Sequence, residues 1–190
     1  MARFVTLLAA VLAVAGLDGC DATGVRAQFE NLDNPNVVVY AMNGTDGTLP
    51  SALLIRSVIA VPITADFGFD VAFDIDDTGA VIAHSVRKVA AEFVSSHRVG
   101  LALSEHAFDS VTTAAGIHFA YDTSLTVPLG KTVVVDAIDP TCSVFSLLGQ
   151  DVYAKFVIDS VHATDRKIFL HLFGDPNCGF RSLAPGTPRE

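Results

Sequence analysis

Tryptophan is missing from this sequence, and basic residues are few. The 190 residues include 12 Lys and Arg against 21 Asp and Glu, so the formal net charge is -9 at pH 7. An acidic chain repels phosphate backbones, which argues against nucleic acid as a partner and against a basic patch for membrane surfaces. The acidic balance is typical of a soluble domain.

Common catalytic signatures are missing as well. No Gly-x-Ser-x-Gly elbow is present. Gly130-Lys131-Thr132 matches the end of a phosphate-binding loop, but Leu125 replaces the first glycine of that pattern. A strand-like run also follows where the phosphate loop needs a helix. We therefore predict a protein that is not an enzyme.

The histidines offer no preformed metal site. No two of the six are one, three or four residues apart, so the spacing of a zinc pair does not occur. A hydrolase or metal enzyme would need three or more of them to converge with carboxylates in a cleft. The six are His84, His97, His106, His118, His162 and His171.

The N-terminus contains an apolar run at residues 4–17, behind Met1-Ala2-Arg3. The run is shorter than the roughly 20 residues that span a bilayer, but it fits the hydrophobic region of an export signal. We predict that residues 1–19 are an export signal peptide, so the protein would act outside the cytoplasm.

Leu17-Asp18-Gly19-Cys20 resembles the bacterial lipobox, from which it departs at Asp18. The resemblance implies that Cys20 is lipidated, becomes the mature N-terminus and anchors the chain to a membrane in the bacterial cell envelope. The rival interpretation is cleavage after Ala15, which leaves Cys20 as a free thiol. Because such a thiol is a liability in an oxidising compartment, we favour lipidation, with residues 20–24 as anchor and short linker.

The other two cysteines, Cys142 and Cys178, are a single pair in an exported chain, which predicts a disulfide. Two buried free thiols are the alternative. A metal pair is disfavoured because neither cysteine has a second ligand at zinc-site spacing.

Residues 67–87 carry the clearest fold signal. Large apolar side chains alternate with small or acidic ones up to Ile75, which is the period of a strand with one buried face. Asp76-Asp77-Thr78-Gly79 then supplies turn chemistry, and a second strand follows. We predict a central β-hairpin here.

Shorter signals complete the predicted fold, an all-β antiparallel sandwich of about ten strands with one or two short helices. A small β-barrel is the alternative. We expect one domain at residues 25–183 and a mobile tail at 184–190. The predicted elements are a hairpin of strands 25–32 and 37–42, a strand at 52–63, irregular structure or one helical turn at 86–94, a helix at 104–116, and strands at 98–103, 125–127, 132–138, 151–160 and 167–173.

Two further segments resemble known proteins. VRAQFENL followed by NVVVYAMNG, from Val25, is similar to the opening of small extracytoplasmic β-sandwich modules of bacterial envelope proteins. Residues 175–183, with the paired Cys178, resemble the closing segment of uncharacterised predicted bacterial lipoproteins. The resemblance implies an extracytoplasmic β-sandwich and no activity.

The turn after Ile75 also matches part of a calcium loop. Asp74, Asp76 and Thr78 would supply oxygen ligands at positions 1, 3 and 5, with Gly79 at position 6. The pattern lacks the bidentate glutamate at position 12, which is Ser85. We therefore prefer the hairpin-turn interpretation, with calcium as an alternative and no other cofactor.

Three functions follow from the sequence. The first is a non-enzymatic envelope module that binds another envelope protein or a glycan, or that has a structural role. The second is a carrier that holds a small apolar ligand between its sheets, suggested by 13 phenylalanines without tryptophan. The third is a hydrolase or metal enzyme. A glycosidase pair could be formed by two of the carboxylates Asp70, Asp74 and Asp76, but a solvated acidic strand face explains these residues more simply.

Overall fold

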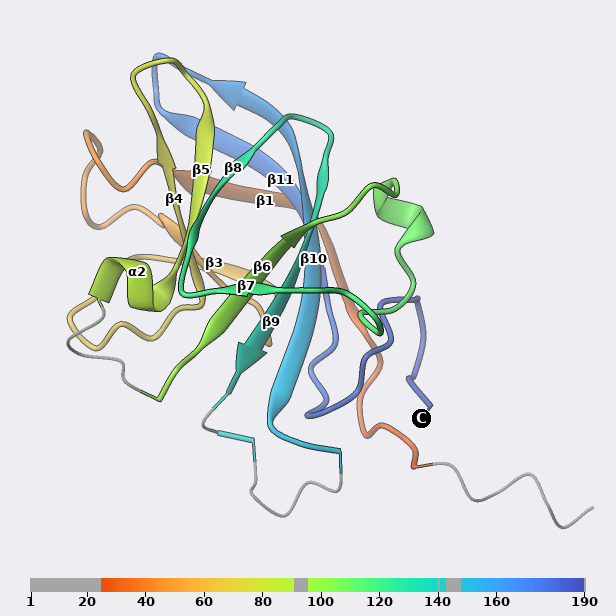
Figure 1. The fold of residues 1–190 in the computed structure, drawn as a ribbon. Coiled ribbons are helices and arrows are strands. Elements are labelled where there is room, and N and C mark those ends of the chain that lie inside the picture. The colour runs from red at the N-terminus through yellow and green to blue at the C-terminus, as the bar shows by residue number, and fades with distance from the viewer. Residues whose placement is uncertain (1–24, 91–95, 140, 143–147, 190) are drawn as a thin grey trace, which may run out of the picture.

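The computed structural model describes residues 25–90, 96–139, 141–142 and 148–189, which form two antiparallel sheets (Figure 1). The first sheet has six strands in the order β1-β11-β10-β9-β6-β7, and the second has five in the order β3-β2-β4-β5-β8. No closed barrel forms within these ranges, so the predicted all-β sandwich is confirmed. Cys20 and the predicted signal peptide lie outside the described residues.

The first sheet contains the longest strands of the fold. Its members are β1 (Leu32–Tyr40), β6 (Val99–Leu103), β7 (Ala120–Tyr121), β9 (Thr132–Ile138), β10 (Asp151–His162) and β11 (Lys167–Gly174). The second sheet contains β2 (Ala52–Leu54), β3 (Ile59–Val61), β4 (Val71–Ile75), β5 (Val81–Ser85) and β8 (Ser124–Val127). Helical structure is limited, among the described residues, to α2 (Val86–Ala90) and the 3-10 turn η1 (Phe108–Ser110).

The core lies between the two sheets, and the predicted central hairpin supplies part of it. β4 pairs with β5, and Phe69, Val71 and Phe73 are fully buried. The Phe73 ring packs edge-on against Phe156 of β10 in the opposite sheet, with 5.4 Å between ring centroids. Burying each such ring stabilises the fold by about 1.5–3 kcal/mol, so this pair contributes to the packing of the two sheets.

The turn of this hairpin has the predicted chemistry. Asp76 Oδ1 accepts hydrogen bonds from the backbone N–H groups of Thr78 and Ala80, each at 2.9 Å. Gly79 has a φ of 86°, a conformation that favours glycine. These bonds hold the carboxylate in its ionised form and lower the pKa of Asp76, the hydroxyl of Thr78 contributing most.

The predicted opening hairpin is wrong. The chain runs through Asp33 to Asn36 as one strand, β1, with a bulge between Asn34 and Val37. Because β1 is an edge strand, Pro35 can lie in the bulge without breaking a ladder, although it has no N–H to donate.

The predicted long strand at 52–63 is also wrong, because it is two short strands. β2 and β3 pair with each other around a turn at residues 55–58, where the Val58 N–H donates to the Ile55 carbonyl at 3.2 Å. Arg56 and Ser57 interrupt the apolar run at this point. They are polar residues of the turn and not the middle of a buried strand.

The predicted helix at 104–116 does not form, apart from the short η1 turn. Its backbone instead pairs with the C-terminal segment: the Ala114 N–H donates to the Arg181 carbonyl and the Leu183 N–H to the Thr112 carbonyl, each at 2.8 Å. Lys155 Nζ of β10 donates to the carbonyls of Phe108 and Val111. These long-range bonds override local helix propensity.

Two further predictions concern α2 and the C-terminal segment. α2 agrees with the predicted single helical turn at 86–94, whose last residues lie outside the described ranges. The C-terminal segment, predicted to be a mobile tail, pairs with residues 25–31: the Ala27 N–H donates to the Pro188 carbonyl at 3.2 Å, and the Asn31 N–H to the Gly186 carbonyl at 3.0 Å.

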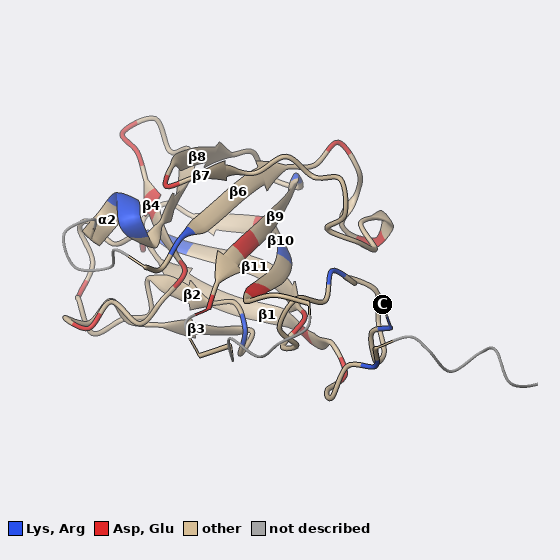
Figure 2. Cartoon of the chain, turned by 60° about the horizontal axis from the view of Figure 1, so that its bottom comes forward, with Lys and Arg blue, Asp and Glu red and all other residues tan. Residues whose placement is uncertain are grey.

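The acidic residues lie mainly outside the strands (Figure 2). Figure 2 shows Asp and Glu mainly in the turns and loops, while most residues of the strands are neither acidic nor basic. In the described part of the chain, no helix is long and apolar enough to cross a membrane.

Candidate functional site

A cleft of about 780 Å³ lies at the end of the sandwich where β1 and β10 begin and β9 ends. Its size is within the range of small-molecule sites, about 300–1,000 Å³. Segments far apart in the sequence form it, and its lining is largely apolar. The lining residues are Phe29, Leu32, Leu54, Ile55, Arg56, Ser57, Gly68, Asp70, His97, Ala137, Asp139, Thr141, Val152 and Pro176.

A buried acid–base pair lines one part of the cleft. Asp70, which precedes β4, is only 3% exposed, and its Oδ1 lies 2.7 Å from Nε2 of His97. Its Oδ2 accepts a hydrogen bond from the Ile55 N–H at 2.7 Å, which caps the turn between β2 and β3. Both carboxylate oxygens thus have partners, so burial of this charge is compensated.

The predicted solvated acidic face is therefore wrong for Asp70. Its neighbours in the chain, Phe69 and Val71, are also buried, so both sides of the chain are covered at this point. Sequence alternation predicts one wet face, but the turn at residues 55–58 folds over the position and needs an acceptor for its N–H.

Arg56 connects three segments at the other side of the cleft. Its Nη1 donates to Asp139 Oδ2 at 3.0 Å and also to the hydroxyl of Thr141, and its Nε donates to the Pro176 carbonyl at 3.2 Å. Burial alone would raise the pKa of Asp139, but hydrogen bonds from Thr141 and Arg56 outweigh it and hold that pKa below its usual value. Asp139 is therefore ionised at neutral pH and neutralises Arg56.

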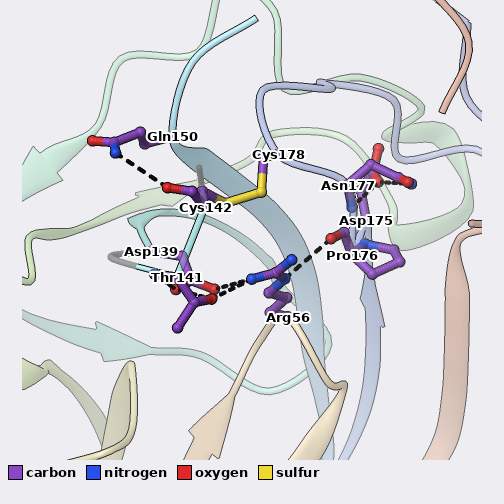
Figure 3. Close-up of a disulfide and its surroundings, with 9 residues drawn as sticks. All are labelled: Arg56, Asp139, Thr141, Cys142, Gln150, Asp175, Pro176, Asn177 and Cys178. Carbon is purple, nitrogen blue, oxygen red and sulfur yellow. Dashed lines mark hydrogen bonds and ion pairs between the residues drawn. A yellow bond between two sulfur atoms is a disulfide. The ribbon is translucent and has the colours of Figure 1, made fainter. Parts of the chain in front are cut away.

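The predicted disulfide is present beside Arg56. Cys142 and Cys178 are joined by an S–S bond of 2.05 Å with their Cα atoms 5.8 Å apart. Figure 3 shows Arg56 reaching Asp139 and Thr141 on one side and Pro176 on the other, the same two segments that the disulfide joins. One wall of the cleft is thus held by a covalent and a charged crosslink together.

The electrostatics of the cleft follow from these two pairs. Arg56 and Asp139 cancel each other, and Asp70 faces His97. The lining therefore has no excess positive charge for an anionic ligand, and the protein as a whole is acidic. An uncharged apolar molecule suits this lining better than an acid does.

The predicted calcium ligands lie elsewhere, near the turn between β4 and β5. Asp74 Oδ1 accepts a hydrogen bond from Arg166 Nη2 at 2.9 Å, and Asp74 Oδ2 one from Asn43. Asp76 and Thr78 bond to each other within the turn. Calcium binding stays a prediction, but an ion here would lie beside the Arg166 guanidinium, which repels a cation.

The histidines do not come together. His84 pairs with Ser124, His171 with Asp33 and His162 with Asp165, at three separate places. Within the described ranges, no three His, Cys, Asp or Glu side chains gather as metal ligands would. His97 alone of the six lines the cleft. In the same part of the chain, no serine, threonine or cysteine side chain is hydrogen-bonded to its ring.

Sequence reasoning missed the cleft. Arg56 and Asp139 are 83 positions apart, and Asp70 and His97 are 27 apart. The one available signal was the polar Arg56-Ser57 inside an apolar run, which indicates a turn but no partner. Comparisons with models of protein families, with curated proteins and with solved structures gave no match.

Proposed function

We propose that this protein is an exported, lipid-anchored protein of the bacterial cell envelope that acts as a binding module and not as an enzyme. The export signal, the lipobox-like segment ending at Cys20 and the disulfide support this location. Both carboxylate oxygens of Asp70 are engaged within the fold, one by His97 and one by the Ile55 N–H, which gives this pair a structural role in the cleft wall.

The cleft favours the carrier form of this proposal, in which the module holds a small apolar ligand. The middle of the core between the sheets is packed, with Phe73 against Phe156, so the space for a ligand is the cleft of about 780 Å³ at one end of the sandwich. Leu54, Ala137 and Val152 provide an apolar lining, and the Arg56 and Asp70 pairs place a few polar groups in it. This combination is typical of small-molecule sites.

Filling the cleft is expected to weaken ligand binding. Gly68 lines the cleft, and an added Cβ there would meet only the Asp66 side chain, at 3.7 Å or more, so the backbone leaves room for a side chain at this position. We expect Gly68→Leu to weaken binding of the uncharged probe N-phenyl-1-naphthylamine by about tenfold or more. The measurement is a fluorescence titration of the full-length chain carrying Cys20→Ser, so that no attached acyl chain competes.

The matched control is Gly47→Leu, where an added Cβ meets nothing within 4 Å and which does not line the cleft. It should bind the probe as the parent does. The anionic analogue 8-anilino-1-naphthalenesulfonate should bind more weakly than the uncharged probe. Equal affinities of the Gly68→Leu and Gly47→Leu variants for the uncharged probe would contradict a ligand site in the cleft.

A further inference from the structure

The rim of the cleft is apolar and exposed. Phe29 is 51% exposed and Leu32 40% exposed, and both line the cleft. Val25, at the start of the described chain, is 38% exposed. Three large apolar side chains in eight residues thus face solvent, two of them in the cleft lining, a pattern that marks interaction surfaces.

The rim is also close in sequence to the proposed anchor. Val25 is only five positions after Cys20, and a chain of that length spans at most about 18 Å when fully extended. Phe29 is nine positions after Cys20, which sets a limit of about 32 Å on their separation. If Cys20 is inserted in a membrane, covalent geometry keeps this rim near the lipid surface.

The far end of the sandwich has no such constraint. The turn between β8 and β9, with Leu129 59% exposed, lies at the opposite end from the start of β1 (Figure 1). The orientation that lets Val25, Phe29 and Leu32 enter the interface removes apolar surface from water, which stabilises it. The same orientation turns the cleft toward the hydrocarbon.

We infer that the cleft receives an acyl chain of a lipid from the membrane in which the protein is anchored. The inference rests on the proposed function and names its ligand class. The neutralised Arg56–Asp139 pair and the apolar wall of Leu54 and Val152 accept hydrocarbon without demanding a charged headgroup. The exposed rim is the path by which the chain enters.

The absence of tryptophan allows a direct test. Leu32→Trp places a single tryptophan on the rim, and Leu129→Trp places one at the far end as a matched control. The full-length, anchored chain is reconstituted in vesicles of phosphatidylcholine brominated on its acyl chain, because bromine quenches tryptophan fluorescence on contact. The Leu32→Trp variant should lose most of its fluorescence and the Leu129→Trp variant almost none.

A second variant tests entry into the cleft. Adding Gly68→Leu to Leu32→Trp should reduce the quenching, since the filled cleft excludes the brominated chain. Unchanged quenching would mean that the rim touches lipid without taking a chain, and it would overturn the inference. Equal quenching of Leu32→Trp and Leu129→Trp would also overturn the inference. So would an unquenched Leu32→Trp variant, which is also the result expected if the acyl group on Cys20 itself, which has no bromine, fills the cleft.

Mass spectrometry of the mature N-terminus separates failure of this inference from failure of the proposed function. An acylated Cys20 together with an unquenched Leu32→Trp variant overturns the inference and leaves the anchored binding module intact. An unmodified N-terminus at residue 16 removes the anchor, and with it both the proposed location and the inference.

Discussion

Replacing Cys142 and Cys178 together by alanine is expected to lower the free energy of unfolding by about 4 kcal/mol. The bond closes a loop of 36 residues that contains β10 and β11, two neighbouring interior strands of the first sheet. Without it the unfolded chain gains conformational freedom, whereas the folded chain loses few contacts. Urea unfolding of the double variant and the parent measures the difference.

Cys20→Ser is the matched control for this experiment, because it removes a cysteine that lies outside the described fold. It should leave the urea midpoint unchanged. Treating the parent with a reductant should reproduce the effect of the double variant. A loss of less than about 1 kcal/mol in the free energy of unfolding would contradict a stabilising role for the disulfide. It would mean that the Arg56 hydrogen bonds are what hold that wall of the cleft together.

The second large effect is expected at Asp136, where removing a buried charge should raise the free energy of unfolding. This residue of β9 is 4% exposed, and its Oδ2 accepts a hydrogen bond from the Tyr121 hydroxyl at 2.7 Å. Its Oδ1 is buried and has no hydrogen-bond partner among the described residues. Burial raises the pKa of Asp136 to about 6, although the Tyr121 hydrogen bond acts in the other direction.

The pH dependence follows from this raised pKa. Between the unfolded value of 3.8 and the folded value of about 6, the folded protein keeps a proton that the unfolded chain has lost. Stability contributed by this group therefore falls as pH rises through that window, and above it the folded state contains a costly buried charge. A rise in pKa from 3.8 to about 6 corresponds to a cost of about 2–3 kcal/mol at neutral pH.

Asp136→Asn is therefore expected to stabilise the protein by about 1–2 kcal/mol at pH 8. The amide oxygen still accepts from Tyr121, but the unpartnered amide N–H₂ offsets part of the gain. At pH 4 the carboxyl is already protonated in the folded state, and the variant should show no gain. Thermal or urea unfolding at the two pH values measures both differences.

The exposed turn residue Asp77 provides the control, since Asp77→Asn changes the same charge without a buried site. It should alter stability little at either pH. A stability of Asp136→Asn that does not differ from the parent at pH 8 would mean that the Asp136 charge is compensated in the folded protein.

The sequence predicted those parts of the fold that depend on local pattern. Alternation up to Ile75 and the Asp76–Gly79 turn identify the central hairpin, and the run 132–138 matches β9 residue for residue. The isolated pair Cys142 and Cys178 was enough to predict the disulfide. In each case a short stretch or a count contains the determining information.

The failures share a different physical cause. The helix at 104–116 was lost to hydrogen bonds with Arg181 and Lys155, and the hairpin at 25–42 to pairing of β1 with β11. Such partners are distant in sequence, so no local pattern encodes them. The cleft is the extreme case, because each of its polar pairs joins a segment next to the second sheet to a segment next to the first, and forms only when the two sheets have packed together.

The cleft as a ligand site is the central claim of this account, and NMR locates a bound ligand most directly. We expect N-phenyl-1-naphthylamine, added to the full-length chain carrying Cys20→Ser, to shift methyl signals of the lining residues Leu54, Ile55 and Val152. Signals of Val81 and Val127, which lie outside the cleft lining, should stay in place. Shifts of equal size in the lining residues and in Val81 and Val127, or shifts confined to Val81 and Val127, would contradict a ligand site in the cleft.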